Sequence, residues 1–188
     1  LLSLIVNLVL VMALLLLQNK QVPKPLYFAS GADGRLTRLV PLSDAYYSKQ
    51  QIQTWVSEKV PQLFALDFLH YRKQLSQSQK FFTKIGWERF MKAFESQIQQ
   101  LKEQQLMTHA SVTDVPFISQ ELILKGAYSF RVQVPIMITF SGTSGKDKGK
   151  SDVNQFVLTL LISRVDNRVN HELFGIQQIV MQPLTDAN

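Results

Sequence analysis

Apolar residues fill the first seventeen positions of the chain, LLSLIVNLVLVMALLLL, where Ser3 and Asn7 are the polar exceptions and no charge occurs. A helix of this length spans about 25 Å, against roughly 30 Å for the apolar core of a bilayer. A signal-peptide core would be shorter, and the QNKQVPKP that follows has no small-residue cleavage pattern. We therefore predict a retained transmembrane helix over residues 1–18. We expect it to begin further upstream, because the chain lacks an initiating Met.

Ser3 and Asn7 share one face of this predicted helix. Polar groups are costly when they face lipid, so these two either contact another membrane helix or lie at headgroup depth. Lys20 and Lys24 follow the apolar run, and the positive-inside tendency would then place the rest of the chain in the cytoplasm. The upstream flank that should be counted against them is not in the sequence, so charge alone leaves the orientation open.

Residues 19–47 are predicted to form an extended linker with a β-hairpin. Pro23 and Pro25 stiffen its first part. Two short strand-like runs flank GADG, where Gly31 and Gly34 suit the positive φ of a turn. An isolated hairpin is only marginally stable in water, so it either docks on its own domain or pairs with a neighbouring chain. For the second alternative, we expect the partner-contacting residues to be Tyr27, Phe28, Arg35 and Arg38.

A helical period follows the linker. Ser48 and Gln51 form a capping-box pattern, and an apolar stripe follows at helical spacing. Pro61 interrupts this helix or starts the next, whose stripe comprises Phe64, Phe68, Tyr71 and Leu75. The third helix begins within FFTKIGWERFMKAF, where Thr83 suits the N-cap and Phe81 or Phe82 can form a hydrophobic staple. Gly86, in its first turn, suits the close approach of a neighbouring backbone or ring.

From about Leu106 the period changes to two, which indicates strands. In AYSFRVQVPIMITF the even positions are apolar and the odd ones mostly polar, and Pro135 marks a bulge or an outward-facing N–H. Two more strand-like runs follow, and the SGTSGKDKGKSD between the first two strands reads as a flexible hairpin tip containing Gly142, Gly145, Lys146, Lys148 and Lys150. Helices followed by an antiparallel meander predict one α+β domain over residues 48–184, with a tail at 185–188. Its predicted core includes Trp55, Phe64, Phe68, Trp87, Phe90, Phe94 and Phe130.

Composition excludes several classes of chemistry. The chain has no cysteine, which excludes disulfides, thiol nucleophiles and Cys-based metal sites. The net charge of +6 suits nucleic acid, anionic lipid or acidic partners, but it also suits a basic solvated surface. His70, His109 and His171 are scattered and have no metal-ligand spacing.

Motifs for catalysis are also missing from the sequence. Asp67 is the one carboxylate with apolar neighbours on both sides, but on a helix it can turn to solvent. The glycine- and lysine-rich loop precedes a strand, whereas a phosphate-binding loop precedes a helix. A nucleic-acid surface would have aromatic residues interleaved with its lysines, and this loop has none. The sequence therefore predicts a non-enzymatic protein with no cofactor or metal site.

Four ordered blocks carry a resemblance to a known family: YFASGADGRLTRLVPL, DFLHYRKQL, FFTKIGWERFMKAF and GAYSFRVQVPIMITF. The chain resembles the DotI/IcmL family, bitopic inner-membrane proteins of Dot/Icm type IVB secretion systems with relatives in IncI-type conjugation machines. The resemblance runs from the apolar N-terminal segment to GIQQIVMQ. The cytoplasmic tail that the family carries before its membrane helix is not in this sequence.

The resemblance implies the cone fold of nuclear transport factor, with about three helices packed on a curved antiparallel sheet of about four strands. It implies that the domain lies in the periplasm, whereas the charges of Lys20 and Lys24 would place it in the cytoplasm. It further implies a non-enzymatic scaffold that self-associates and supports assembly of the effector-translocation channel. The implied partners are membrane lipid and other inner-membrane components, including a DotJ-like protein, with no small-molecule substrate or nucleic acid.

Two other functions stay open on the sequence. A membrane-anchored cone-fold protein that binds a ligand or catalyses a reaction would need Asp67, His70 or Tyr71 to point into a pocket. A conjugation component that contacts DNA would use Lys146, Lys148 and Lys150, and its affinity would fall with salt.

Overall fold

The computed structural model describes residues 3, 6–7, 10–12, 27–30, 36–143, 149, 151–166, 172 and 174–184. The chain divides into two compact units, Leu1–Pro41 and Leu42–Asn188. In the first unit, β1 (Tyr27–Ser30) pairs antiparallel with β2 (Leu36–Leu39), which confirms the predicted hairpin. Its tip at residues 31–34 and the candidate contact residue Arg35 lie outside the described residues.

The predicted membrane span is described at six positions. These six, including Ser3 and Asn7, are helical and exposed. Among the described residues, no helix combines the length and apolar character needed to cross a bilayer. The predicted span covers residues 1–18, and its remaining positions lie outside the described residues.

The second unit begins its helical layer with α2 (Lys49–Phe64). The predicted capping box is confirmed: the Gln51 N–H donates to Ser48 Oγ over 3.2 Å, and the Ser48 N–H donates to Gln51 Oε1 over 2.8 Å. Pro61 lies inside α2, so the prediction of a break there was wrong. A proline near the end of a helix removes a single N–H, while the Pro61 carbonyl still accepts the Ala65 N–H over 3.1 Å.

The predicted second helix is also corrected. Phe64 is the last residue of α2, whereas Tyr71 and Leu75 belong to α3 (Tyr71–Ser78), so their stripe does not lie on one helix. Between the helices, Asp67 forms an antiparallel bridge with Met107 of β3 (Leu106–Val112). This strand-like pairing overrides the helical spacing of the apolar residues in the sequence.

The aromatic segment leads into α4 (Lys84–Glu103) after the 3-10 turn η1 (Gln79–Phe81). Thr83 caps the helix, because its Oγ1 accepts the Gly86 N–H over 3.0 Å. The rings of Phe82 and Trp87 lie 5.4 Å apart between centroids, which confirms the predicted staple. Gly86 faces the backbone of β7 (Phe174–Pro183), and a Cβ there would lie 2.0 Å from the Ile176 carbonyl oxygen.

Within the described residues, five strands form one antiparallel sheet. The long central strands β5 (Ala127–Gly142) and β6 (Ser151–Arg164) pair from Ser129–Ser163 to Ser141–Ser151, and β7 lies beyond β6. On its other edge β5 is long enough to pair with β4 (Phe117–Leu124) along its first half and β3 along its second. The sheet therefore has one strand more than the predicted four, because two short strands share one edge.

Pro135 lies where that edge passes from one short strand to the other. Its carbonyl accepts the Thr113 N–H over 3.0 Å, from the segment between β3 and β4. Pro135 itself stays in register with Val157, without a bulge at that position. Because a residue in an antiparallel strand turns its N and O to the same side, the missing N–H faces the gap between β3 and β4.

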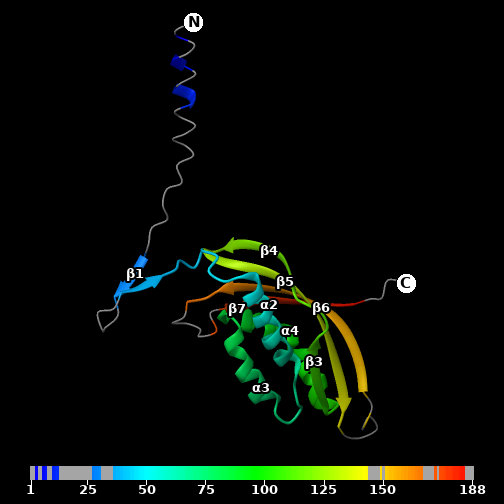
Figure 1. Ribbon diagram of the computed structural model, residues 1–188. Coiled ribbons are helices and arrows are strands. Elements are labelled where there is room, and N and C mark those ends of the chain that lie inside the picture. The colour runs from blue at the N-terminus through cyan, green and yellow to red at the C-terminus, as the bar shows by residue number, and fades with distance from the viewer. Residues whose placement is uncertain are drawn as a thin grey trace. The chain divides into compact units, whose positions relative to one another are not determined.

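The core lies between the helices and the inner face of the sheet. The sheet strands β5 and β6 curve around the helices (Figure 1). The alternation predicted for β5 is confirmed by its buried even positions, from Phe130 to Ile138. Trp55, Phe64, Phe90 and Phe130 are buried, whereas Phe68, Trp87 and Phe94 are partly buried and pack against that core. The α4 aromatics form a continuous stack, with Phe90 and Phe94 at 5.0 Å between centroids.

Candidate functional site

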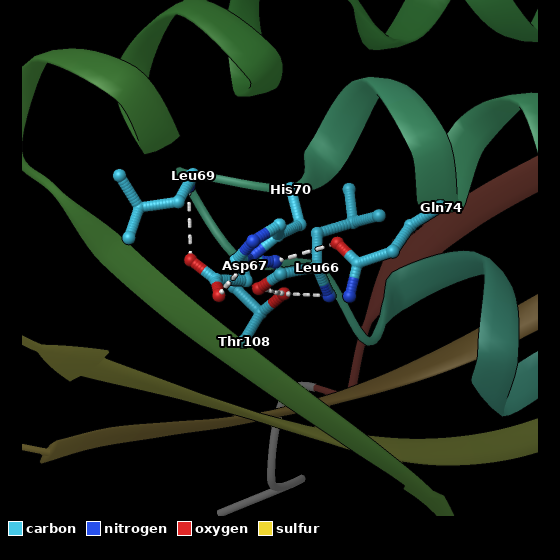
Figure 2. Close-up of polar contacts among 6 residues, drawn as sticks. All are labelled: Leu66, Asp67, Leu69, His70, Gln74 and Thr108. Carbon is cyan, nitrogen blue, oxygen red and sulfur yellow. Dashed lines mark hydrogen bonds and ion pairs between the residues drawn. The ribbon is translucent and has the colours of Figure 1, made fainter.

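The corner between α2 and α3 holds the candidate acid–base residues Asp67 and His70 (Figure 2). Asp67 Oδ1 accepts the Leu69 N–H over 2.9 Å, and Asp67 Oδ2 lies 3.0 Å from His70 Nδ1. The Asp67 N–H donates to Gln74 Oε1 over 2.9 Å. Every polar group of Asp67 therefore holds the turn that reverses the chain between the two helices.

Thr108 holds the same corner through hydrogen bonds from β3. Its hydroxyl donates to the Phe64 carbonyl over 2.6 Å and accepts the Leu66 N–H over 2.9 Å, and the side chain is buried. The Thr108 N–H also donates to the Leu66 carbonyl over 2.7 Å. Buried backbone groups need such partners, so this threonine is the polar anchor of the corner. Its position in an ordinary strand pattern carries no sequence signal for that role.

The electrostatics of the corner suit a structural carboxylate. The hydrogen bonds from His70 and from the Leu69 N–H lower the pKa of Asp67, so it is ionised at neutral pH. A general acid needs the opposite shift, which an apolar pocket would provide. The His70 side chain is 66% exposed, so water surrounds the imidazole that pairs with Asp67. This pair is built to hold a turn, and its geometry offers no buried proton donor.

Tyr71 lies apart from this pair. Its hydroxyl accepts a hydrogen bond from Arg72 Nε over 3.1 Å, and its side chain lines a groove between α3 and α4. Asp67 and His70 do not line that groove. The three residues proposed for a ligand site thus do not converge on one pocket. Within the described ranges there is also no group of three or more His, Asp or Glu placed to hold a metal.

The lysine-rich loop is described only at its borders. Gly142 ends β5, while Gly145, Lys146, Lys148 and Lys150 lie outside the described residues. The strands that flank the loop pair with each other as far as Ser141 and Ser151, which agrees with a hairpin connection. The hairpin of the first unit presents Phe28 as a largely exposed side chain, at 54%.

Arg164 is a residue that the sequence analysis missed. Its Nη1 donates to the Asp44 carbonyl over 2.7 Å, and its guanidinium lies 5.6 Å from the ring centroids of both Tyr46 and Tyr47. Burial lowers the pKa of Arg164, while the nearby tyrosines and Asp44 oppose that shift. This contact fixes the lead segment, residues 42–48, to the end of β6. The one sequence signal was an arginine next to the last residue of the mostly apolar run VLTLLISRV.

Comparison with known proteins identifies the family. A family model described as "Type-IV b secretion system, inner-membrane complex component", DotI/IcmL, matches residues 1–183. The chain belongs to the DotI/IcmL family. The membership confirms the resemblance seen in the sequence and makes the chain a membrane-complex component of a type IV secretion system. Among curated proteins, no sequence matches the chain.

One solved structure agrees with this membership, and two more share the fold of the described domain. The periplasmic domain of DotI is 31% identical, with a TM-score of 0.67, and the match covers 74% of this chain and 99% of that domain. A periplasmic fragment of TraM is 23% identical, with a TM-score of 0.63, over 73% of this chain and 98% of the fragment. CagV of Helicobacter pylori, a VirB8 homolog, has the same fold at 15% identity and a TM-score of 0.57, over 73% of this chain and 100% of CagV. The predicted α+β architecture is therefore confirmed.

Proposed function

We propose that this DotI/IcmL family member is a non-enzymatic scaffold of the inner-membrane complex. In this proposal residues 1–18 form a single-pass anchor, and the α+β domain lies in the periplasm, where it self-associates and supports assembly of the translocation channel. The observation that carries the proposal is the 31% identity of the described domain to the periplasmic domain of DotI over nearly all of that domain. Self-association and contact with a DotJ-like protein are the two parts of this proposal that an experiment tests.

Two surfaces are proposed for assembly. The hairpin of β1 and β2 has two strands and thus two outer edges, which can pair with a neighbouring strand. We assign this contact to Tyr27, Phe28, Arg35 and Arg38. In the membrane, Ser3 and Asn7 are assigned to contacts between anchors, because a polar group shared between helices avoids lipid.

The test is assembly in cells that contain the whole secretion system. The full chain is extracted in detergent and weighed by mass photometry, and a photocrosslinker at Phe28 reports its neighbours. We expect particles larger than one chain and crosslinks to itself or to another secretion component. The matched control replaces Lys146, Lys148 and Lys150 by alanine, which should leave assembly unchanged. A monomeric particle without crosslinks to any secretion component contradicts the scaffold.

A further inference from the structure

A groove with a volume of about 720 Å³ runs between α3 and α4. Among the described elements, α3 lies close to α2 and to the consecutive turn η1, and has few close contacts with α4. From α3, Tyr71 and Leu75 line the groove, and from α4, Trp87, Met91 and Ile98 line it. The family comparison assigns no role to this groove, and the corner at Asp67 lies outside it.

The floor of the groove is apolar. Leu75 is 5% exposed, whereas Trp87, Met91 and Ile98 are only partly buried and show the rest of their side chains to the groove. Trp87 is held by ring contacts with Phe82 at 5.4 Å and Phe90 at 5.8 Å. A large aromatic side chain held by neighbouring rings, beside an adaptable thioether, is typical of docking surfaces.

The rim of the groove is basic. Arg72, Lys92 and Lys102 line it, and Glu95 is the one carboxylate among the lining residues. Within the described part of the chain, no ion pair occupies Lys92 or Lys102. The hydrogen bond from Arg72 lowers the pKa of Tyr71, and the charge of Lys102 acts in the same direction. Basic side chains from both α3 and α4 thus line the groove.

The walls favour a helical occupant. Backbone groups within α3 and α4 are bonded inside each helix, so an extended segment would find few partners for its own N–H and C=O groups. A helix satisfies its backbone internally and needs only side-chain contacts. From Trp87 to Ile98 the floor extends about 16 Å along α4, which matches about three turns of a docked helix. Lys92 and Lys102 stand about 15 Å apart along the same helix.

We propose that the groove between α3 and α4 binds a short acidic amphipathic helix of another secretion-system protein. The apolar face of that helix covers Trp87, Met91 and Ile98, and its carboxylates meet Arg72, Lys92 and Lys102. The proposal rests on the scaffold function above and adds to it a surface and the chemistry of its partner. The charge of the rim decides the occupant, because an apolar floor alone would accept any hydrophobic segment.

The first test uses the full chain in detergent and a labelled acidic amphipathic peptide of about three turns, followed by fluorescence anisotropy. The comparison probe is the same peptide with each Glu replaced by Lys. We expect at least tenfold tighter binding of the acidic peptide, at least tenfold weakening by K92E/K102E, and no change with K125E/R131E. The last variant makes the same charge change outside the groove. Equal binding of both peptides, no binding, or equal effects of the two variants would overturn the proposal.

The second test identifies the natural occupant. A photocrosslinker at Met91 in cells should capture an acidic amphipathic segment of another secretion component, and the yield should fall in the K92E/K102E background. A crosslinker at Arg131 is the control. Capture of a second copy of this chain, or of a segment without acidic residues, overturns the assignment. Because oligomer mass is measured separately, loss of groove binding in a normally sized particle refutes the groove alone, whereas a monomer refutes the scaffold.

Discussion

The contact between Gly86 and β7 gives the sharpest test of how α4 docks on the sheet. A Cβ at residue 86 would lie 2.0 Å from the Ile176 carbonyl oxygen and 3.0 Å from Gln177 Cα. Both neighbours are backbone atoms of a paired strand, so neither can rotate away. Relief requires α4 and β7 to separate, which also stretches the bond from the Thr83 N–H to the Ile176 carbonyl, now 3.1 Å.

The magnitude for Gly86→Ala follows from three effects. Overpacking of this severity costs about 3 kcal/mol, and the lost hydrogen bond costs about 1 kcal/mol. Alanine in a helix returns about 1 kcal/mol relative to glycine. We therefore expect a loss of about 3 kcal/mol in the free energy of unfolding and a fall of about 6–12 °C in Tm.

Thermal unfolding of the full chain in detergent, followed by near-UV circular dichroism, measures this loss. Gly126→Ala is the control: its site has φ +79° and nothing within 4 Å of the added Cβ. That variant tests backbone conformation without a clash and should cost about 1–2 kcal/mol. A Gly86→Ala protein as stable as the parent would show that α4 does not approach β7 at this point.

Three further predictions concern the corner and the lead segment. Thr108→Val leaves the Leu66 N–H and the Phe64 carbonyl without their buried hydroxyl partner and should cost about 2–3 kcal/mol in urea unfolding, while Thr108→Ser should cost less. Asp67→Ala should lower Tm at pH 7. The folded-state pKa of Asp67 lies below its ordinary value of 3.8. The difference in Tm between the variant and the parent should therefore be complete above pH 3.8 and vanish as the pH falls through the lowered pKa. A pH-independent difference would assign the effect to packing. Arg164→Met should speed amide exchange in residues 42–48 and leave exchange in β5 unchanged, because the lost contacts to Asp44, Tyr46 and Tyr47 are local; unchanged exchange in both regions would remove the anchoring role.

Local signals in the sequence predicted the starts of α2 and α4 and the buried face of β5. Ser48, Gln51 and Thr83 act through neighbours three residues away, so their caps can be read without knowing the fold. Gly86 could be linked to a close approach, but Ile176 as the partner could not be named, because it lies ninety residues further along the chain. The even-numbered face of β5 was equally readable, since every buried position there is apolar.

Long-range pairing explains the errors. Helical spacing alone continues through Phe64, Phe68 and Tyr71, and only the bridge between Asp67 and Met107 shows why the helix stops. At the same corner, contacts with the Leu69 N–H and with His70 give the Asp67 carboxylate a structural role that its apolar sequence neighbours did not suggest. Whether a carboxylate enters a pocket or caps a turn depends on contacts that a sequence pattern of period 3.6 does not encode.

The groove follows from the same corner. Because Thr108 and the bridge between Asp67 and Met107 tie the chain to β3, α3 starts at a fixed point, close to α2 and with few close contacts to α4. The α4 stripe is then not fully covered: Phe90 is buried among neighbouring rings that include Phe64 and Phe82, while Trp87, Met91 and Ile98 stay partly open. A stripe that reads as core in the sequence thus becomes part core and part surface. If the corner sets the width of the groove, Thr108→Val should weaken binding of the acidic peptide as well as stability, although Thr108 does not line the groove.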